Sequence, residues 1–160
     1  MPDRIEVGMG KGMVARAPCV LCCSGVGSCA VLALYDNELR LGGLAHIMLP
    51  DSGKLNGYLP PYRCADTALA LLMKELRTMK ASPRHIVAKL AGGARMFASD
   101  KNPGPSIGEQ NTASIKQMLK RDLIPLAGES TGGSQGRTIE FHLNSGMVAV
   151  KATGRVLEEI

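Results

Sequence analysis

The chain has 160 residues, of which 45% are hydrophobic and 21% charged, and its formal net charge is +5. This size and balance predict a single compact domain over residues 1–160, because disordered chains carry fewer apolar residues. The basic residues are spread along the chain, there is no Trp, and runs such as AVLAL are too short to cross a bilayer, which disfavours nucleic-acid binding and membrane insertion.

Short apolar or alternating runs in the N-terminal third predict strands. Gly, Pro and an Asp-Asn-Glu turn separate these runs. We expect strands at residues 4–8, 20–25, 30–35 and 44–50.

Residues 63–80 have helical periodicity. Asp66 or Thr67 is expected to cap the start of this helix. Its apolar residues recur at helical spacing, at Ala68, Leu69, Leu72, Leu76 and Met79.

A second helix is expected to begin at the capping-box sequence of Ser106–Glu109 and to end near Arg121. Its inward residues are expected to be Ile115, Met118 and Leu119. Further strands are expected at residues 85–94, 123–129, 137–143 and 147–152, the last two joined as a hairpin through residues 144–146. This order of elements predicts a layered α/β (α+β) domain of mixed sheet with packed helices.

Four of the five cysteines lie within thirteen residues, in CVLCCSGVGSCAV. The N-terminus has no apolar signal core, and free thiols fit a reducing compartment, so a cytoplasmic location is expected. Cys19 and Cys22 form a C-x-x-C, but on a strand their side chains point to opposite faces. A redox or metal module built on Cys19, Cys22 and Cys23 therefore remains a minor alternative, and no second cluster offers the ligands of a zinc site.

Cys29 follows a turn, Gly25-Val26-Gly27-Ser28, that is expected to expose its sulfur. Glycines allow tight backbone geometry, so successive N–H groups of such a turn can point at one oxyanion. Cys29 is therefore a candidate nucleophile, although a buried cysteine leading an apolar strand explains the pattern about as well.

Three histidines could supply a base. His85 and His142 fit surface positions, whereas His46 interrupts the apolar run LAHIML and needs a partner or a purpose. Cys29 and His46 lie on consecutive predicted strands that are expected to pair as neighbours. They form the favoured catalytic pair, with a satisfied core histidine as the alternative.

Six segments, in this order, resemble the CheD family of chemoreceptor glutamine deamidases: GVGSCAV, GGLAHIMLPDSG, ADTAL, AKLAGGARMF, SIGEQN and ESTGGSQGRTIEF. The resemblance runs from about Val7 to Val150. It implies a cysteine hydrolase that converts glutamines in the cytoplasmic helical bundle of chemoreceptors to glutamate, with possible hydrolysis of glutamyl methyl esters. It also implies a fold similar to glutamine-deamidating toxins and a CheC-type phosphatase as partner.

The same resemblance assigns the nucleophile to Cys29 and the histidine to His46. The family commonly has a threonine six residues before the nucleophile as its third catalytic member, whereas this chain has Cys23. A thiol accepts hydrogen bonds weakly, so Cys23 is expected to orient His46 poorly.

The chemistry of these residues agrees with deamidation. Cys29 would attack the carboxamide, backbone N–H groups near Gly27 and Ser28 would hold the oxyanion, and His46 would move the protons. No metal or organic cofactor is needed. The competing interpretation is a non-catalytic regulator that binds receptors or CheC.

Overall fold

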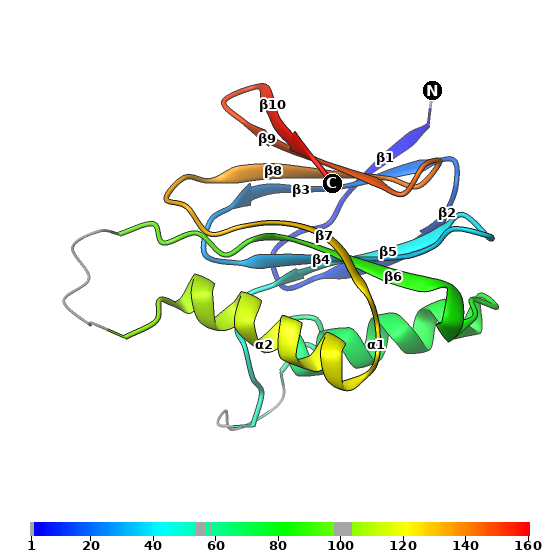
Figure 1. Cartoon of the computed structure of the whole chain (residues 1–160), viewed down its shortest axis with the longest axis horizontal. Helices are drawn as coiled ribbons and strands as arrows, with labels where there is room; N and C mark the ends of the chain where they lie inside the picture. Colours follow the sequence, from blue (N-terminus) through cyan, green and yellow to red (C-terminus); the bar gives the residue numbers. More distant parts are fainter. Residues whose placement is uncertain (1, 54–56, 58, 98–103) are drawn as a thin grey trace.

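The computed structural model describes all residues except 1, 54–56, 58 and 98–103, and these described residues form three stacked layers (Figure 1). The outer sheet has the order β1 (Asp3–Glu6), β3 (Cys19–Val26), β8 (Arg137–His142), β9 (Met147–Ala152) and β10 (Arg155–Glu159). The central sheet has the order β2 (Gly12–Arg16), β5 (Leu41–Ile47), β4 (Ala30–Asp36), β6 (Ile86–Gly92) and β7 (Leu126–Thr131).

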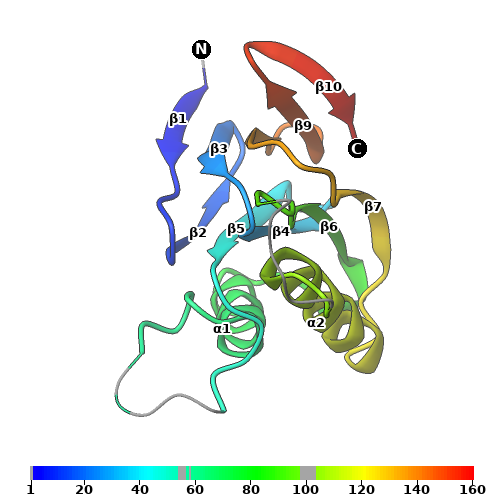
Figure 2. The ribbon, with the colours of Figure 1, turned by 90° about the vertical axis from the view of Figure 1, so that its left-hand side faces the viewer.

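Two helices form the third layer, α1 (Ala65–Thr78) and α2 (Ile107–Arg121), and a short 3₁₀ helix η1 (Pro83–His85) leads into β6. The helices cover the face of the central sheet that is turned away from the outer sheet (Figure 2). Both sheets are mixed, because β1 pairs parallel with β3 and β6 pairs parallel with β7, whereas the other pairs are antiparallel. The predicted α+β class with mixed sheet and packed helices is confirmed. No helix in the described part of the chain is long and apolar enough to span a membrane.

The central sheet is buried on both faces, which explains the unbroken apolar sequence of β4. Alternate residues of a strand point to opposite faces. In β4, Leu32 and Leu34 pack against the helices, whereas Val31 and Tyr35 pack against the outer sheet. The site described below lies on the second of these faces, between the two sheets.

Helix α1 lies within the predicted range, but its predicted cap is wrong. Cys64 is the N-cap residue and makes no side-chain capping bond. The backbone N–H of Ala65 instead donates to the Leu49 carbonyl, at 2.9 Å. Asp66 accepts a hydrogen bond from the Ser52 hydroxyl, at 2.6 Å. A backbone carbonyl of the segment before α1 therefore accepts a hydrogen bond from the first turn of the helix, and no side chain caps it.

Helix α2 begins and ends as predicted. The Ser106 hydroxyl accepts from the Glu109 N–H, at 3.2 Å, which is one half of a capping box. The Glu109 carboxylate pairs with Arg95 instead of returning to the Ser106 backbone. The predicted inward residues are all buried: Ile115, Met118 and Leu119.

The strand prediction missed β2 and β10 and misplaced the end of β5. β2 is a partly buried edge strand, and all five residues of β10 are exposed, so neither has a continuous apolar face. β5 ends at Ile47, so residues 48–50 do not continue it as predicted. The predicted pairing of β4 with β5 is confirmed, with Val31 opposite His46.

Candidate active site

Three carbonyl groups of the turn between β3 and β4 are held by neighbouring groups. The Gly27 carbonyl accepts from the Ala94 N–H at 2.9 Å, and the Cys29 carbonyl accepts from the Gly93 N–H at 2.8 Å. The Ser28 carbonyl accepts from the side-chain Nδ2 of Asn111, at 3.0 Å. The backbone around Cys29 is therefore fixed from the segment directly after β6 and from α2.

The N–H groups of Ser28 and Cys29 point away from these anchors. A trans peptide unit directs its C=O and the following N–H in opposite directions, so a held carbonyl also sets the next N–H. Within the described part of the chain, neither N–H donates to an acceptor elsewhere in the protein. Two free, preorganised donors beside a thiol are what an oxyanion site requires.

Gly92 allows β6 to come close to the turn between β3 and β4 that contains Cys29. Its φ is +97°, and a Cβ at this position would lie 2.5 Å from the Cys29 carbonyl oxygen. Arg137 holds the end of β6 in place, because its guanidinium donates to the Gly92 carbonyl at 3.1 Å and to the Gly132 carbonyl at 2.6 Å. A side chain at position 92 would therefore push the Cys29 backbone out of place.

Cys29 is buried rather than exposed, which corrects the expectation from the sequence. Its residue exposure is 7%, and it packs in the core between the sheets with Val26 and Ala91. Burial raises the pKa of the Cys29 thiol, and its own backbone N–H counteracts this by favouring the thiolate.

His46 lies on the same face of the central sheet as Cys29. Val31 is directly opposite His46, and Cys29 lies two residues before Val31, so all three side chains project toward the outer sheet. Extending this register makes Cys29 and His46 diagonal neighbours on adjacent strands, at a spacing that long side chains bridge.

The His46 ring is buried, with one nitrogen bonded and one free. Its Nδ1 lies 3.3 Å from the Val7 carbonyl oxygen, so Nδ1 carries the proton and Nε2 the lone pair. Nε2 has no hydrogen-bond partner among the described residues. Burial lowers the pKa of His46, which keeps the ring neutral near pH 7.

Cys23 lies in the same core as Cys29, on the facing strand β3. Its side chain is fully buried and is opposite Ile139 in the strand pairing. Burial raises the pKa of Cys23, and the neighbouring Glu6 and Cys29 act in the same direction. Within the described residues, Cys23 makes no hydrogen bond with His46, whose Nδ1 is held by Val7.

The remaining cysteines are free thiols set apart from this pair. Cys19 packs in the core between the sheets, whereas Cys22 lies near Arg4 and Glu140, on the other face of β3. The predicted divergence of the C-x-x-C is therefore confirmed. Across the described ranges, no group of three or more His, Cys, Asp or Glu residues is placed to hold a metal ion.

The other two histidines are partly exposed, as expected. The His85 Nδ1 lies 3.5 Å from a Glu38 carboxylate oxygen, and the His142 Nε2 lies 3.5 Å from a Glu140 carboxylate oxygen. Both histidines contact carboxylates away from the Cys29 turn.

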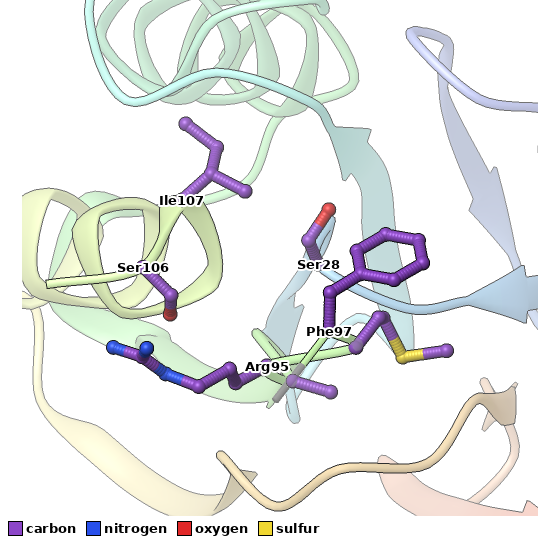
Figure 3. Close-up of a pocket in the computed structure, with 7 residues that line it drawn as sticks. Ser28, Arg95, Phe97, Ser106 and Ile107 are labelled. Atoms are coloured by element: carbon purple, nitrogen blue, oxygen red, sulfur yellow. The ribbon is translucent and has the colours of Figure 1, made fainter. Parts of the chain in front are cut away.

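A small pocket opens beside the turn between β3 and β4, at Ser28 (Figure 3). Ser28 lines it from the turn, Arg95 and Phe97 from the segment after β6, and Ser106 and Ile107 from the start of α2. Phe97 is 78% exposed and Met96 is 42% exposed. The pocket beside Ser28 is thus rimmed by exposed apolar side chains and one guanidinium, and Cys29 and His46 are not among its lining residues.

Sequence reasoning missed three contributors to this site. The Val7 carbonyl and the Asn111 amide act across long sequence separations that no local pattern reveals. The close approach of Gly92 and Gly93 to Cys29 depends on strand pairing, which the local sequence does not show.

Comparison with known proteins agrees with this geometry. A sequence model described as "CheD chemotactic sensory transduction" matches residues 48–152. The chain belongs to the CheD family. A relative from Moorella thermoacetica is 44% identical over 161 residues, covering 99% of this chain and 96% of the relative. A relative from Clostridium novyi is 42% identical over 159 residues, covering 99% of this chain and 98% of the relative.

A further relative, from Thermococcus kodakarensis, is 39% identical over 158 residues, covering 98% of this chain and 98% of the relative. Each of the three is named "Probable chemoreceptor glutamine deamidase CheD". The CheD sequence model begins after Cys29 and His46, whereas these relatives match nearly the whole chain. The three-layer fold described above is the fold of this CheD chain.

Proposed function

We propose that the protein is a protein-glutamine deamidase that hydrolyses selected glutamine side chains of chemoreceptors, with Cys29 as nucleophile and His46 as base. The observation that carries this proposal is the arrangement at one sheet face. Cys29 lies beside two free backbone N–H groups, and the unpartnered Nε2 of His46 lies on the adjacent strand. The names of the relatives point to the same reaction.

The first half-reaction transfers the substrate acyl group to Cys29. Burial raises the pKa of the thiol and lowers that of His46, so the resting pair is neutral thiol and neutral imidazole. His46 Nε2 takes the thiol proton as sulfur attacks the carboxamide carbon. The N–H groups of Ser28 and Cys29 donate to the oxyanion. The C–N bond then breaks, and the proton on His46 leaves with ammonia.

The second half-reaction releases glutamate. His46, neutral again, removes a proton from water, and the resulting hydroxide attacks the thioester carbonyl. The tetrahedral intermediate expels the Cys29 thiolate, which regains its proton from His46. A glutamyl methyl ester would enter the same thioester with methanol as leaving group, so ester hydrolysis is part of the proposal. Cys23 has a minor role, because it lies beside the catalytic pair of Cys29 and His46 and is not a member of that pair.

The surroundings of the site support a macromolecular substrate. Met96, Phe97 and Ile107 are exposed around the pocket next to Ser28, and Met9 is exposed on the β1–β2 connection. Exposed apolar side chains gathered in one place favour protein contacts over a small polar ligand. The proposed substrate is the cytoplasmic helical bundle of a receptor, the proposed location is the cytoplasm, and a CheC-type phosphatase is the proposed regulator.

The direct test incubates the protein with a receptor cytoplasmic fragment and follows Gln-to-Glu conversion by peptide mass spectrometry. We expect a mass increase of about 1 Da at selected glutamines, with ammonia released in equal amount. Binding of the fragment without conversion would instead support a non-catalytic regulator.

A further inference from the structure

Asn111 is a fully buried polar residue on α2 that reaches both strands of the catalytic pair. Its Nδ2 donates to the Ser28 carbonyl at 3.0 Å and to the Met48 carbonyl at 3.1 Å. Ser28 directly precedes Cys29, and Met48 lies two residues after His46. One amide group with two hydrogens thus joins the backbone at the start of β4 to the backbone at the end of β5.

The opposite end of the same side chain is unsatisfied. Asn111 Oδ1 is buried and has no hydrogen-bond partner among the described residues. Nδ2 faces two carbonyl oxygens, which can only accept, so exchanging the amide oxygen and nitrogen would leave both carbonyls facing another acceptor. A buried oxygen without a partner opposes folding. The side chain therefore fits a role in holding the two carbonyls better than a role in packing alone.

We propose that Asn111 is a positioning residue for the Cys29 nucleophile. By holding the Ser28 carbonyl on the helix side, Asn111 directs the Cys29 N–H toward the opposite side, where the sulfur and the oxyanion site lie. Its second bond keeps the end of β5, and with it His46, at a fixed distance from that turn. The oxyanion part of this inference rests on the proposed function, whereas the effect on the Cys29 thiol does not.

Two measurable consequences follow from the direction of the Cys29 N–H. This N–H lies near its own Sγ and favours the thiolate against the effect of burial. Releasing the Ser28 carbonyl should weaken that contact and so raise the pKa of the thiol. It should also weaken oxyanion stabilisation, which lowers kcat and leaves KM unchanged, because the fully buried Asn111 cannot touch the substrate.

The test compares Asn111→Ala and Asn111→Ser with the wild-type chain, so that a folding defect in one variant leaves the other. Ser114→Ala is the matched control, because the Ser114 hydroxyl also joins α2 to the segment after β5, by a 2.9 Å bond to the Pro50 carbonyl. The first readout is the pH dependence of Cys29 alkylation by iodoacetamide, measured by peptide mass spectrometry. The second is kcat and KM for receptor-fragment deamidation, with thermal unfolding as a check.

For the Asn111 variants we expect the apparent thiol pKa to rise by about 0.5 to 1 unit, as for loss of one hydrogen bond to the thiolate. We expect kcat to fall roughly 10- to 100-fold with KM within about twofold. Ser114→Ala should match the wild type in both readouts.

Faster alkylation with an unchanged apparent pKa would mean that the substitution only loosens the structure around Cys29, and this would overturn the proposal. A change confined to KM would overturn it as well. If the wild type does not deamidate, the proposed function fails, and the alkylation profile still decides the role of Asn111.

Discussion

His46 Nδ1 lies 3.3 Å from the carbonyl oxygen of Val7, 39 residues earlier in the chain. A backbone carbonyl is a strong acceptor in a fixed place, so it sets both the tautomer and the direction of the ring. The Nε2 lone pair is then available to a thiol on the adjacent strand. The acceptor beside Nδ1 is thus a main-chain carbonyl of the segment that follows β1, whereas the resemblance to the family had pointed to the side chain at position 23.

Cys29→Ala should abolish deamidation, by at least about a thousandfold, because the variant has no atom to form the thioester. Folding should remain intact, because alanine fits in the space that cysteine occupies and only one position of the core is changed. The measurement is Gln-to-Glu conversion of a receptor fragment, with far-UV circular dichroism as a folding check. Cys19→Ala is the control, because Cys19 is a buried thiol of the same core outside the pair. Product formation by the Cys29 variant at the wild-type rate would refute the assignment.

His46→Ala should be nearly as damaging as Cys29→Ala, and the double variant should lose little more than either single one. Nucleophile and base act as one unit, so removing the second partner of a broken pair has a small further effect. The measurement is kcat/KM for all three variants. Multiplicative losses in the double variant would show that His46 supports the fold and takes no part in proton transfer.

The pH dependence of kcat/KM should follow the His46 base. Burial lowers the pKa of His46 below its ordinary value of 6.5, so the neutral ring is the dominant form at and above pH 6.5. Activity should therefore hold as pH falls to about 6.5 and decline only at lower pH, as the ring becomes protonated. A pH series of kcat/KM in one buffer system of constant ionic strength tests this. An acid limb centred above 6.5 would contradict the buried environment of the ring.

The sequence predicted both helices and most of the strands because these elements leave local signals, and local signals also led to the proposal of Cys29 and His46 as the principal residues of the site. A helical repeat defined α1 and α2, and a histidine in an apolar run marked His46. The contacts that hold the site were hidden, since Val7 reaches His46 and Asn111 reaches the Ser28 carbonyl only through the stacking of layers. The burial of Cys29 was also hidden, because it depends on the packing of side chains between the two sheets.

Glu140 should stabilise the outer sheet through two basic partners. Its carboxylate accepts from Arg4 on β1 at 3.0 Å and from Lys151 on β9 at 2.9 Å. The hydrogen bonds and charges of Lys151 and Arg4 outweigh burial and lower the pKa of Glu140 from 4.5 to about 2. The stabilisation is thus complete above pH 4.5 and is lost as pH falls toward 2.

Glu140→Gln should accordingly reduce the free energy of unfolding at pH 7 by roughly 1 to 3 kcal/mol, and the loss should shrink as pH is lowered through this range. Urea unfolding at pH 7, 4 and 3 measures it. Glu38→Gln is the control, because its carboxylate is exposed and pairs only with His85 in the described structure. An equal effect of both substitutions would mean that the contacts of Glu140 with Arg4 and Lys151 add nothing to stability.

Cys23 gives the last prediction, because it occupies the place where relatives of this chain are expected to have a catalytic threonine. The Cys23 side chain is fully buried near Cys29 and Glu6, and the Nδ1 of His46 is already bonded to Val7. Cys23→Ala should therefore lower kcat by no more than about tenfold, or 1.4 kcal/mol of barrier. Cys23→Thr should keep or raise the rate, because a hydroxyl accepts hydrogen bonds better than a thiol. Both rates are measured by receptor-fragment deamidation, with Cys19→Ala again as the matched buried thiol. If Cys23→Ala proved as inactive as Cys29→Ala while remaining folded, Cys23 would itself be catalytic, and the Val7 carbonyl would not be enough to orient the base.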